Sequence, residues 1–172
     1  IEVLQMLHIK SPLFTWRCHT CVGWFRAISD GQSLICLDWN QTGWTDIDHP
    51  DIVSRETVAQ LMAYFDGQLH YFDLPLSPEG VSQSRRYWLD IMATIPYGIT
   101  ISYAEFAAAA GHPKAARAAG TVCATNPVPI IYPCHRVLHK NGTLGRYGGG
   151  SILSPAHPEN IERKAFLINH EA

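Results

Sequence analysis

The sequence predicts an α+β fold in two domains, a small α/β domain at residues 1–76 and an α-rich domain at residues 77–172. Runs rich in β-branched and aromatic residues, which are typical of strands, lie in the first part, whereas apolar residues at helical spacing dominate the second. The segment LPLSPEG between them combines two prolines with a glycine, as is typical of a boundary. We therefore place the domain boundary in this segment.

The formal charge also changes along the chain. Residues 1–80 contain four Lys or Arg and ten Asp or Glu, a net charge of −6, and the remaining residues contain nine and five, a net charge of +4. A positive second part favours a phosphate-bearing partner, although an uneven scatter of solvated charges would give the same numbers. No apolar run is long enough to cross a membrane, and the five cysteines lack the dense spacing of a disulfide scaffold. We expect a cytoplasmic protein, or a nuclear one in a eukaryote.

Two strand-like runs come first, at residues 16–28 and 33–39, and Asp30-Gly31 between them predicts a hairpin turn. The first run contains Cys18 and Cys21, which have the spacing of half a zinc site. Because no second Cys pair accompanies them, two thiols on a strand are the simpler interpretation, and we expect no metal.

Two longer helices are predicted from apolar residues that recur three and four positions apart. The first, at residues 54–67, has Ser54 as its N-cap and Gly67 just after its end. The second, at residues 82–95, stops before Pro96. The faces expected to be buried are Val58, Leu61, Met62 and Phe65 in the first helix, and Trp88, Ile91, Met92 and Ile95 in the second.

Two short helices joined by a tight turn follow. Ser102 and Glu105 have the spacing of a capping box, and Gly111 suits the end of the first helix. Pro113 is of the type favoured at a first helical position, so it opens a second helix that must end before Asn126 and the proline after it. This pattern indicates a helix-turn-helix, whose second helix would be presented to DNA.

The second of these helices carries one long side chain, Arg117, among very small ones. A helix with so little side-chain bulk can approach a minor groove that is only about 6 Å wide. Alternatively, the alanines pack tightly against a neighbouring helix and Arg117 makes a surface ion pair. The small residues around the arginine are Ala115, Ala116, Ala118, Ala119 and Gly120.

Cys134 and His135 follow a segment in which three prolines restrict the backbone around a short buried strand at residues 130–131. Cysteine is an effective nucleophile only as a thiolate, so it needs a base nearby. His135 can be that base, through a water molecule because adjacent side chains usually diverge. Taken alone, the pair equally fits a buried thiol beside a structural histidine.

Several motifs in order resemble the O6-alkylguanine-DNA alkyltransferase family, also called methylated-DNA–protein-cysteine methyltransferases. PCHR is preceded by GHPKAARAAG and NPVPI and followed by NGTLGRYGGG. The resemblance covers residues 72–150, resumes at RKAFLINHE and is faint in the first 70 residues. It implies transfer of the alkyl group from O6-alkylguanine, and from O4-alkylthymine, in duplex DNA to a cysteine of the protein, once per molecule.

The resemblance also implies a role for each matching catalytic residue. Cys134 would be the alkyl acceptor and His135 its base through a water molecule. Glu171 would orient the histidine, and Asn126 would shape the active-site turn. The implied protein binds duplex DNA as a monomer, without a cofactor or a metal.

On the DNA side, Arg117 resembles the arginine finger that fills the space left by a base rotated out of the helix. Tyr103 matches the tyrosine that promotes this rotation and contacts the rotated guanine. The other implied residues are Ala115, Ala116, Ala118 and Gly120 for close approach to DNA, Val137 for a carbonyl that faces the guanine amino group, and Tyr147, Gly148 and Gly149 for a lid beside the reacting oxygen.

The chain departs from the family pattern at residues 151–162, an insertion that bears on the lid and on the position of Glu171. Gly148 stands where many relatives carry Ser or Ala, and Phe166 stands where Trp is frequent. Three alternatives remain: a lesion sensor without a nucleophile, a cysteine hydrolase, and a helix-turn-helix transcription regulator. Cys134 argues against the sensor, and the alanines of the second helix argue against a reader of base edges.

Overall fold

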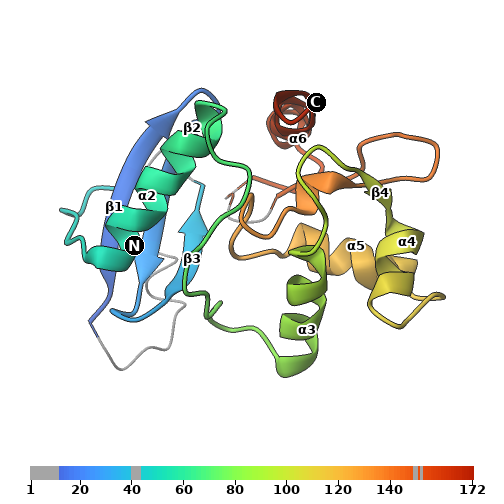
Figure 1. Cartoon of the computed structure of the whole chain (residues 1–172), viewed down its shortest axis with the longest axis horizontal. Coiled ribbons are helices and arrows are strands. Elements are labelled where there is room, and N and C mark those ends of the chain that lie inside the picture. Colours follow the sequence, from blue (N-terminus) through green and yellow to red (C-terminus); the bar gives the residue numbers. More distant parts are fainter. Residues whose placement is uncertain (1–11, 40–43, 149–150, 152) are drawn as a thin grey trace. The chain divides into compact units, whose positions relative to one another are not determined.

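The computed structural model describes residues 12–39, 44–148, 151 and 153–172. The chain divides into two compact units, residues 1–80 and 81–172 (Figure 1). The first unit contains a three-stranded sheet and a helix, and the second is mainly helical. The predicted α+β class is confirmed. No helix among the described residues is long and apolar enough to cross a membrane.

The N-terminal unit is an antiparallel sheet with one helix packed against it (Figure 1). Every residue of the third strand is buried, as are the last five residues of the central strand. The elements are β1 (Phe14–Thr20), β2 (Gly23–Ser29), β3 (Leu34–Asp38) and helix α2 (Ile52–Phe65), and the strands pair in the order β1-β2-β3.

Turn chemistry breaks the run at residues 16–28, which the sequence predicts as one strand and which forms two. The Thr20 hydroxyl accepts the Val22 N–H at 3.3 Å and donates to the Gly23 carbonyl at 2.9 Å, which closes a tight turn between β1 and β2. The turn predicted at Asp30-Gly31 is confirmed, because the Asp30 carboxylate accepts the N–H of Ser33 at 2.8 Å. Side-chain hydrogen bonds to the backbone thus set both ends of β2.

Helix α2 begins earlier than predicted, because Asp51 and not Ser54 is its N-cap. The Asp51 carboxylate accepts the Ser54 N–H at 2.8 Å, and the Ser54 hydroxyl accepts the Asp51 N–H at 2.9 Å, a reciprocal capping box. The buried face also differs from the predicted one, since Met62 is 38% exposed although it was predicted to be buried. The buried residues are Val53, Ser54, Thr57, Leu61 and Tyr64.

The C-terminal unit surrounds a short parallel ladder with helices (Figure 1). Trp88 and Met92 of the first helix are buried as predicted, whereas Ile91 is half-buried and Leu89 is buried instead. The elements are α3 (Gln83–Met92), β4 (Ile101–Ser102), α4 (Tyr103–Ala109), α5 (Ala116–Ala124), the 3-10 helix η1 (Cys134–Arg136), β5 (Val137–Leu138) and α6 (Pro158–His170).

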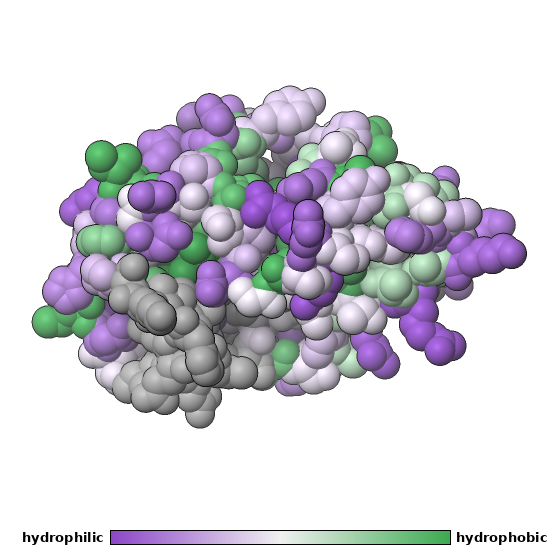
Figure 2. All heavy atoms as spheres, turned by 90° about the horizontal axis from the view of Figure 1, so that it is seen from below, coloured by the Kyte–Doolittle hydropathy of each residue, from purple (hydrophilic) through white to green (hydrophobic). Residues whose placement is uncertain are grey.

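Helices α4 and α5 form the predicted helix-turn-helix. The capping box is confirmed: the Ser102 hydroxyl accepts the Glu105 N–H at 3.1 Å, and the Glu105 carboxylate accepts the Ser102 N–H at 2.7 Å. Helix α5 begins at Ala116 and not at Pro113, because Ala115 N–H donates to the His112 carbonyl and closes a turn over the proline. Figure 2 shows hydrophilic side chains projecting from the edge of this unit that carries α4 and its neighbouring turns.

Residues 130–131, predicted as a short strand, form a turn. Ile130 has a φ of +73°, which is incompatible with an extended strand. The Tyr132 N–H donates to the Val128 carbonyl at 3.0 Å, so the chain folds back on itself immediately before Cys134.

The cap of α2 is testable by mutation. Asp51→Ala removes the side chain that accepts from Ser54 and from the Ser29 hydroxyl (2.7 Å), so we expect a loss of about 1–2 kcal/mol of unfolding free energy in urea. Glu56→Ala, an exposed change in the same helix, should cost less than about 0.5 kcal/mol. Equal effects of the two changes would show that Asp51 is not the cap.

Candidate active site

The Cys134 thiol lies at the start of η1 and is 1% exposed. The Asn126 amide donates to the Cys134 sulfur at 3.2 Å and to the Tyr132 carbonyl at 2.7 Å, while its oxygen accepts the Val128 N–H at 3.0 Å. One buried amide therefore holds both the turn and the sulfur. Asn126 lies two residues beyond the end of α5, so the helix that was predicted to meet DNA leads directly into this turn.

Burial raises the pKa of the Cys134 thiol, and the Asn126 hydrogen bond and the nearby Lys164 cation oppose that rise. The net direction is upward, so the resting group is a protonated thiol. A thiol of this kind needs a base before it can act as a nucleophile.

His135 is fully buried and points its Nε2 at Glu171 Oε1, 2.7 Å away. Burial lowers the pKa of the imidazole, although Glu171 opposes this, so the ring is neutral at neutral pH. The neutral ring carries its proton on Nε2, which donates it in a hydrogen bond to the Glu171 carboxylate. Nδ1 is then unprotonated, and its lone pair can accept a proton. Nδ1 is buried and has no hydrogen-bond partner among the residues that the structure describes.

Glu171 follows α6 as its C-cap and is 5% exposed. Besides the histidine, its carboxylate accepts from Arg136 Nε at 2.8 Å, from Arg136 Nη2 at 2.9 Å and from the Gly98 N–H at 3.2 Å. The insertion does not displace it: the His157 ring caps α6 by accepting the Glu159 N–H, and Pro158 occupies the first turn. The four residues predicted as catalytic are therefore all buried and form two hydrogen-bonded pairs, Asn126 with Cys134 and His135 with Glu171, which are adjacent in the chain at residues 134 and 135.

Lys164 was missed by the sequence analysis and lies at the centre of the site. It is fully buried, and its ammonium donates to the carbonyls of Val137 (2.7 Å) and Leu144 and to the Tyr103 hydroxyl at 3.3 Å. Burial lowers the pKa of Lys164, and the nearby Cys134 opposes that shift. The signal was present in RKAFLINHE, where this lysine precedes Glu171 by two helical turns and so shares its helix face.

A cavity of about 420 Å³ opens on the exposed face of α5. Four of the residues predicted to meet DNA line it, and Ala115, Ala118 and the sulfur of Cys134 do not. Its lining residues are Tyr103, Ala116, Arg117, Gly120, Thr121, Ala124, His139 and Arg146.

The predicted lid packs against the insertion. Tyr147 is 1% exposed, and its N–H donates to the Pro155 carbonyl at 2.9 Å. A Cβ atom at Gly148 would lie 2.9–3.1 Å from three atoms of Pro155, which explains why the side chain of Ser or Ala is missing here. Gly149 lies outside the described residues, and the Val137 carbonyl accepts one hydrogen bond, from Lys164.

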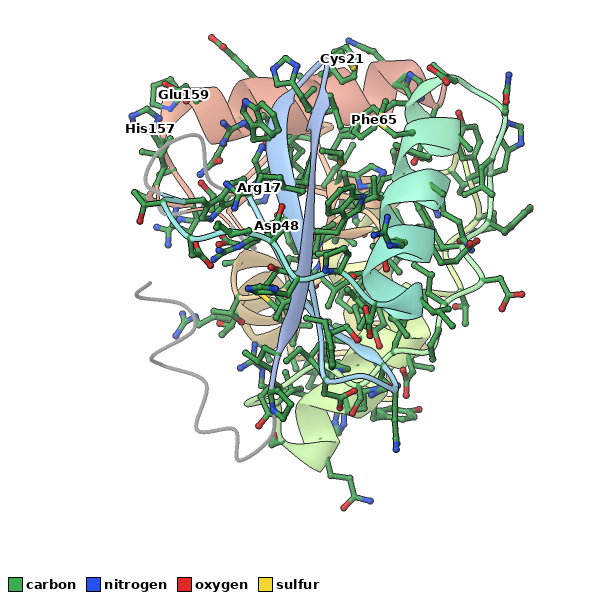
Figure 3. All side chains as sticks on the ribbon, turned by 90° about the vertical axis from the view of Figure 1, so that its left-hand side faces the viewer. Arg17, Cys21, Asp48, Phe65, His157 and Glu159 are labelled. Carbon is green, nitrogen blue, oxygen red and sulfur yellow. The ribbon has the colours of Figure 1, made fainter. Side chains whose placement is uncertain are left out.

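Cys18 and Cys21 do not share one environment. Cys18 is buried, which raises the pKa of its thiol to about 11, whereas Cys21 is exposed at the end of the hairpin (Figure 3). Asp48, which contacts the same strand, is held by Arg17 at 2.7 Å (Figure 3). Across the ranges that the structure describes, no three His, Cys, Asp or Glu side chains are grouped as metal ligands.

Comparison with known proteins points to one family. Residues 83–172 match the family model of the DNA-binding domain of 6-O-methylguanine DNA methyltransferases. The constitutive methylated-DNA–protein-cysteine methyltransferase of Bacillus subtilis is 40% identical over 76% of this chain and 78% of that protein. The methylated-DNA–protein-cysteine methyltransferase of Mycobacterium tuberculosis (H37Rv) is 50% identical over 77% of this chain and 72% of that protein.

Solved structures agree with these relatives. The crystal structure of Mycobacterium tuberculosis OGT in complex with DNA has a TM-score of 0.75 at 34% identity, over 92% of this chain and 91% of that one. The O6-methylguanine-DNA methyltransferase of Pyrococcus kodakaraensis KOD1 has a TM-score of 0.63 at 22% identity, over 94% of this chain and 99% of that one, and so shares the fold.

The contact between Gly148 and Pro155 predicts that alanine at position 148 destabilises the protein. Gly148→Ala should lower the unfolding free energy by about 1–3 kcal/mol, since backbone and ring atoms of Pro155 must move. Gly120→Ala is the matched control, because no atom lies within 4 Å of its added Cβ in α5 and alanine favours a helix. If urea unfolding shows both variants to be equally stable, Pro155 does not hold the lid.

Proposed function

Since the chain belongs to the methylated-DNA–protein-cysteine methyltransferase family and is an enzyme of that class, we propose that Cys134 takes the alkyl group from O6-alkylguanine in duplex DNA. One observation carries this proposal. The Cys134 sulfur is held by Asn126, and the adjacent His135 has a buried Nδ1 without a partner in the described chain while its other nitrogen is bound to Glu171.

In the proposed reaction, a water molecule accepts the Cys134 thiol proton and passes a proton to His135 Nδ1. The Glu171 carboxylate, 2.7 Å from Nε2, stabilises the imidazolium that forms. Because burial lowers the pKa of His135, the acceptor form persists below the usual titration range of histidine. The Lys164 cation stabilises the thiolate.

The thiolate then attacks the alkyl carbon in line with its bond to O6. A carbon–sulfur bond forms, the carbon–oxygen bond breaks, and its electron pair stays on guanine as an anion. Burial raises the pKa of the Tyr103 hydroxyl, so it remains protonated and able to donate a hydrogen bond to the guanine. Tyr103 already accepts a hydrogen bond from Lys164, which polarises its proton toward the base.

A stacked base cannot reach a sulfur that is 1% exposed, so the damaged nucleotide must rotate out of the duplex. The exposed face of α5 supports an approach through the minor groove, because Ala116, Gly120 and Ala124 offer little bulk around Arg117. The guanidinium of Arg117 can fill the vacated space. O4-alkylthymine presents an alkyl group on a comparable ring oxygen, and we include it as a second substrate.

The product is a thioether at Cys134. Neither His135 nor Lys164 can hydrolyse a carbon–sulfur bond of this kind, so each molecule reacts once. A single chain supplies every residue that the mechanism uses, which supports action as a monomer.

The acceptor role is tested by intact-protein mass spectrometry after incubation with duplex DNA that contains O6-methylguanine. We expect the mass of one added methyl group, located on the peptide with Cys134 and absent in Cys134→Ser. Cys123→Ser, a change of another buried thiol, should still gain it. DNA binding without any gain in mass would support a lesion sensor, and repeated turnover would support a hydrolase.

The role of Arg117 is tested by comparing two substrates. Arg117→Ala should slow repair of O6-methylguanine in duplex DNA by about tenfold or more, because the few kcal/mol needed to rotate the base are no longer offset. The rate with free O6-benzylguanine, which needs no rotation, should stay within about twofold of the wild-type rate, a difference too small to reflect a lost contact. An equal loss on both substrates would contradict the finger role.

A further inference from the structure

The cavity on α5 has two sides with different origins. Ala116, Arg117 and Gly120 come from α5, whereas His139 and Arg146 come from the segment that follows β5. Among its described lining residues, none is acidic. Two guanidinium groups thus border one small opening without a carboxylate among them.

Neither guanidinium is neutralised by another residue that the structure describes. Within the described residues, the side chains of Arg117 and Arg146 have no hydrogen-bond or ion-pair partner, and both residues are exposed. By contrast, Arg136 of the same unit is fully engaged with Glu171 and the Ile95 carbonyl. An arginine left unpaired beside a concave surface is available for an anionic ligand.

The backbone at Arg146 is fixed against the active site. A Cβ at Gly145, which has a φ of +69°, would lie 2.7 Å from the Tyr103 hydroxyl and 3.0 Å from His139 Nε2, so the chain packs directly on both rings. The Arg146 carbonyl accepts from Lys164 at 3.4 Å, and Tyr147 is buried immediately after it. The flexible side chain therefore starts from a rigid point beside Tyr103.

We propose that Arg146 binds a backbone phosphate of the damaged strand beside the everted nucleotide, with His139 lining the same wall of the cavity. The inference rests on the proposed function, because it requires a base to enter past Tyr103. That base remains attached to its own phosphates, which would then lie near Tyr103, on the surface that Arg146 shares with it. A guanidinium is suited to a phosphodiester because it presents paired donors in one plane.

In this arrangement, the two arginines come from different segments and have different roles. Arg117 enters the space that the base has left, and Arg146 holds the backbone of the nucleotide that has moved. Both contacts stabilise the state in which the nucleotide is rotated out of the duplex. The phosphate contact is independent of the base that is damaged, so it should contribute affinity without contributing base specificity.

The proposal is tested with duplexes that carry O6-methylguanine and one neutral methylphosphonate, placed in turn at each phosphate on either side of the lesion. Binding is measured with Cys134→Ser protein, so that no transfer occurs. At one position the methylphosphonate should weaken binding by about tenfold, as expected for the loss of a charged hydrogen-bonded contact. The same duplex should have no such effect on the Arg146→Gln form of that protein.

Two controls separate this contact from general effects. Arg146→Gln should reduce the slope of log binding constant against log salt concentration by the amount expected for about one phosphate contact. Arg55→Gln, an equal loss of charge in the N-terminal unit, should leave this slope unchanged. Arg146→Lys keeps the charge and should retain part of the sensitivity to the methylphosphonate.

Equal sensitivity of both proteins at every position would overturn the proposal. With Cys134 present, Arg146→Gln should react with free O6-benzylguanine at the wild-type rate. A loss there as large as on duplex DNA would assign Arg146 to the lid instead, and would also overturn the proposal. Failure of methyl transfer to wild-type Cys134 would refute the proposed function itself, and that result is independent of the binding comparison.

Discussion

The catalytic unit depends on the hydrogen bonds that the buried Glu171 carboxylate accepts. This carboxylate accepts hydrogen bonds from His135, from two nitrogens of Arg136 and from the Gly98 backbone. A buried carboxylate is stable only when its lone pairs are satisfied and its charge is paired, and this one, at the end of α6, is satisfied by groups from two other segments. The end of α6, the η1 turn and the loop after α3 are therefore joined at one point. The hydrogen bond from His135 to this carboxylate also sets the tautomer of the histidine.

Helix α6 contributes a second charge to the site. Lys164, two turns before Glu171, reaches the carbonyls of Val137 and Leu144 and the hydroxyl of Tyr103. One helix thus supplies the anion that orients the base and the cation that faces the thiol. In the insertion before this helix, Pro155 lies against Gly148 and His157 caps the start of the helix.

Local chemistry decided which parts of this arrangement could be predicted from the sequence. The capping box of α4 and the family resemblance rest on adjacent residues and are confirmed. The start of α5 at Ala116 was missed because a turn over Pro113 satisfies the backbone that the proline was expected to open. The turn at Ile130 depends on contacts across the chain reversal, which no spacing rule reports.

In the site, too, features that rest on local sequence could be predicted, and features that rest on contacts between distant segments could not. The family motif around PCHR identified Cys134 and His135, whereas the adjacent pair alone left their roles open. Lys164 acts through carbonyl groups on other segments, and a lysine among carbonyls has no sequence signature. The position of Glu171 beyond an insertion could be expected only from resemblance. Its contact with His135 depends on how α6 begins, which is a property of the His157 cap.

The most direct test of this account is the reaction rate of Glu171→Gln with free O6-benzylguanine as a function of pH. A glutamine that keeps its oxygen toward Arg136 must present its amide N–H₂ to His135 Nε2, which moves the ring proton to Nδ1 and removes the acceptor for the thiol proton. We predict a rate at least about a hundredfold lower at neutral pH, in a variant that still binds duplex DNA. A wild-type rate and pH profile would contradict the claim that Glu171 sets the base.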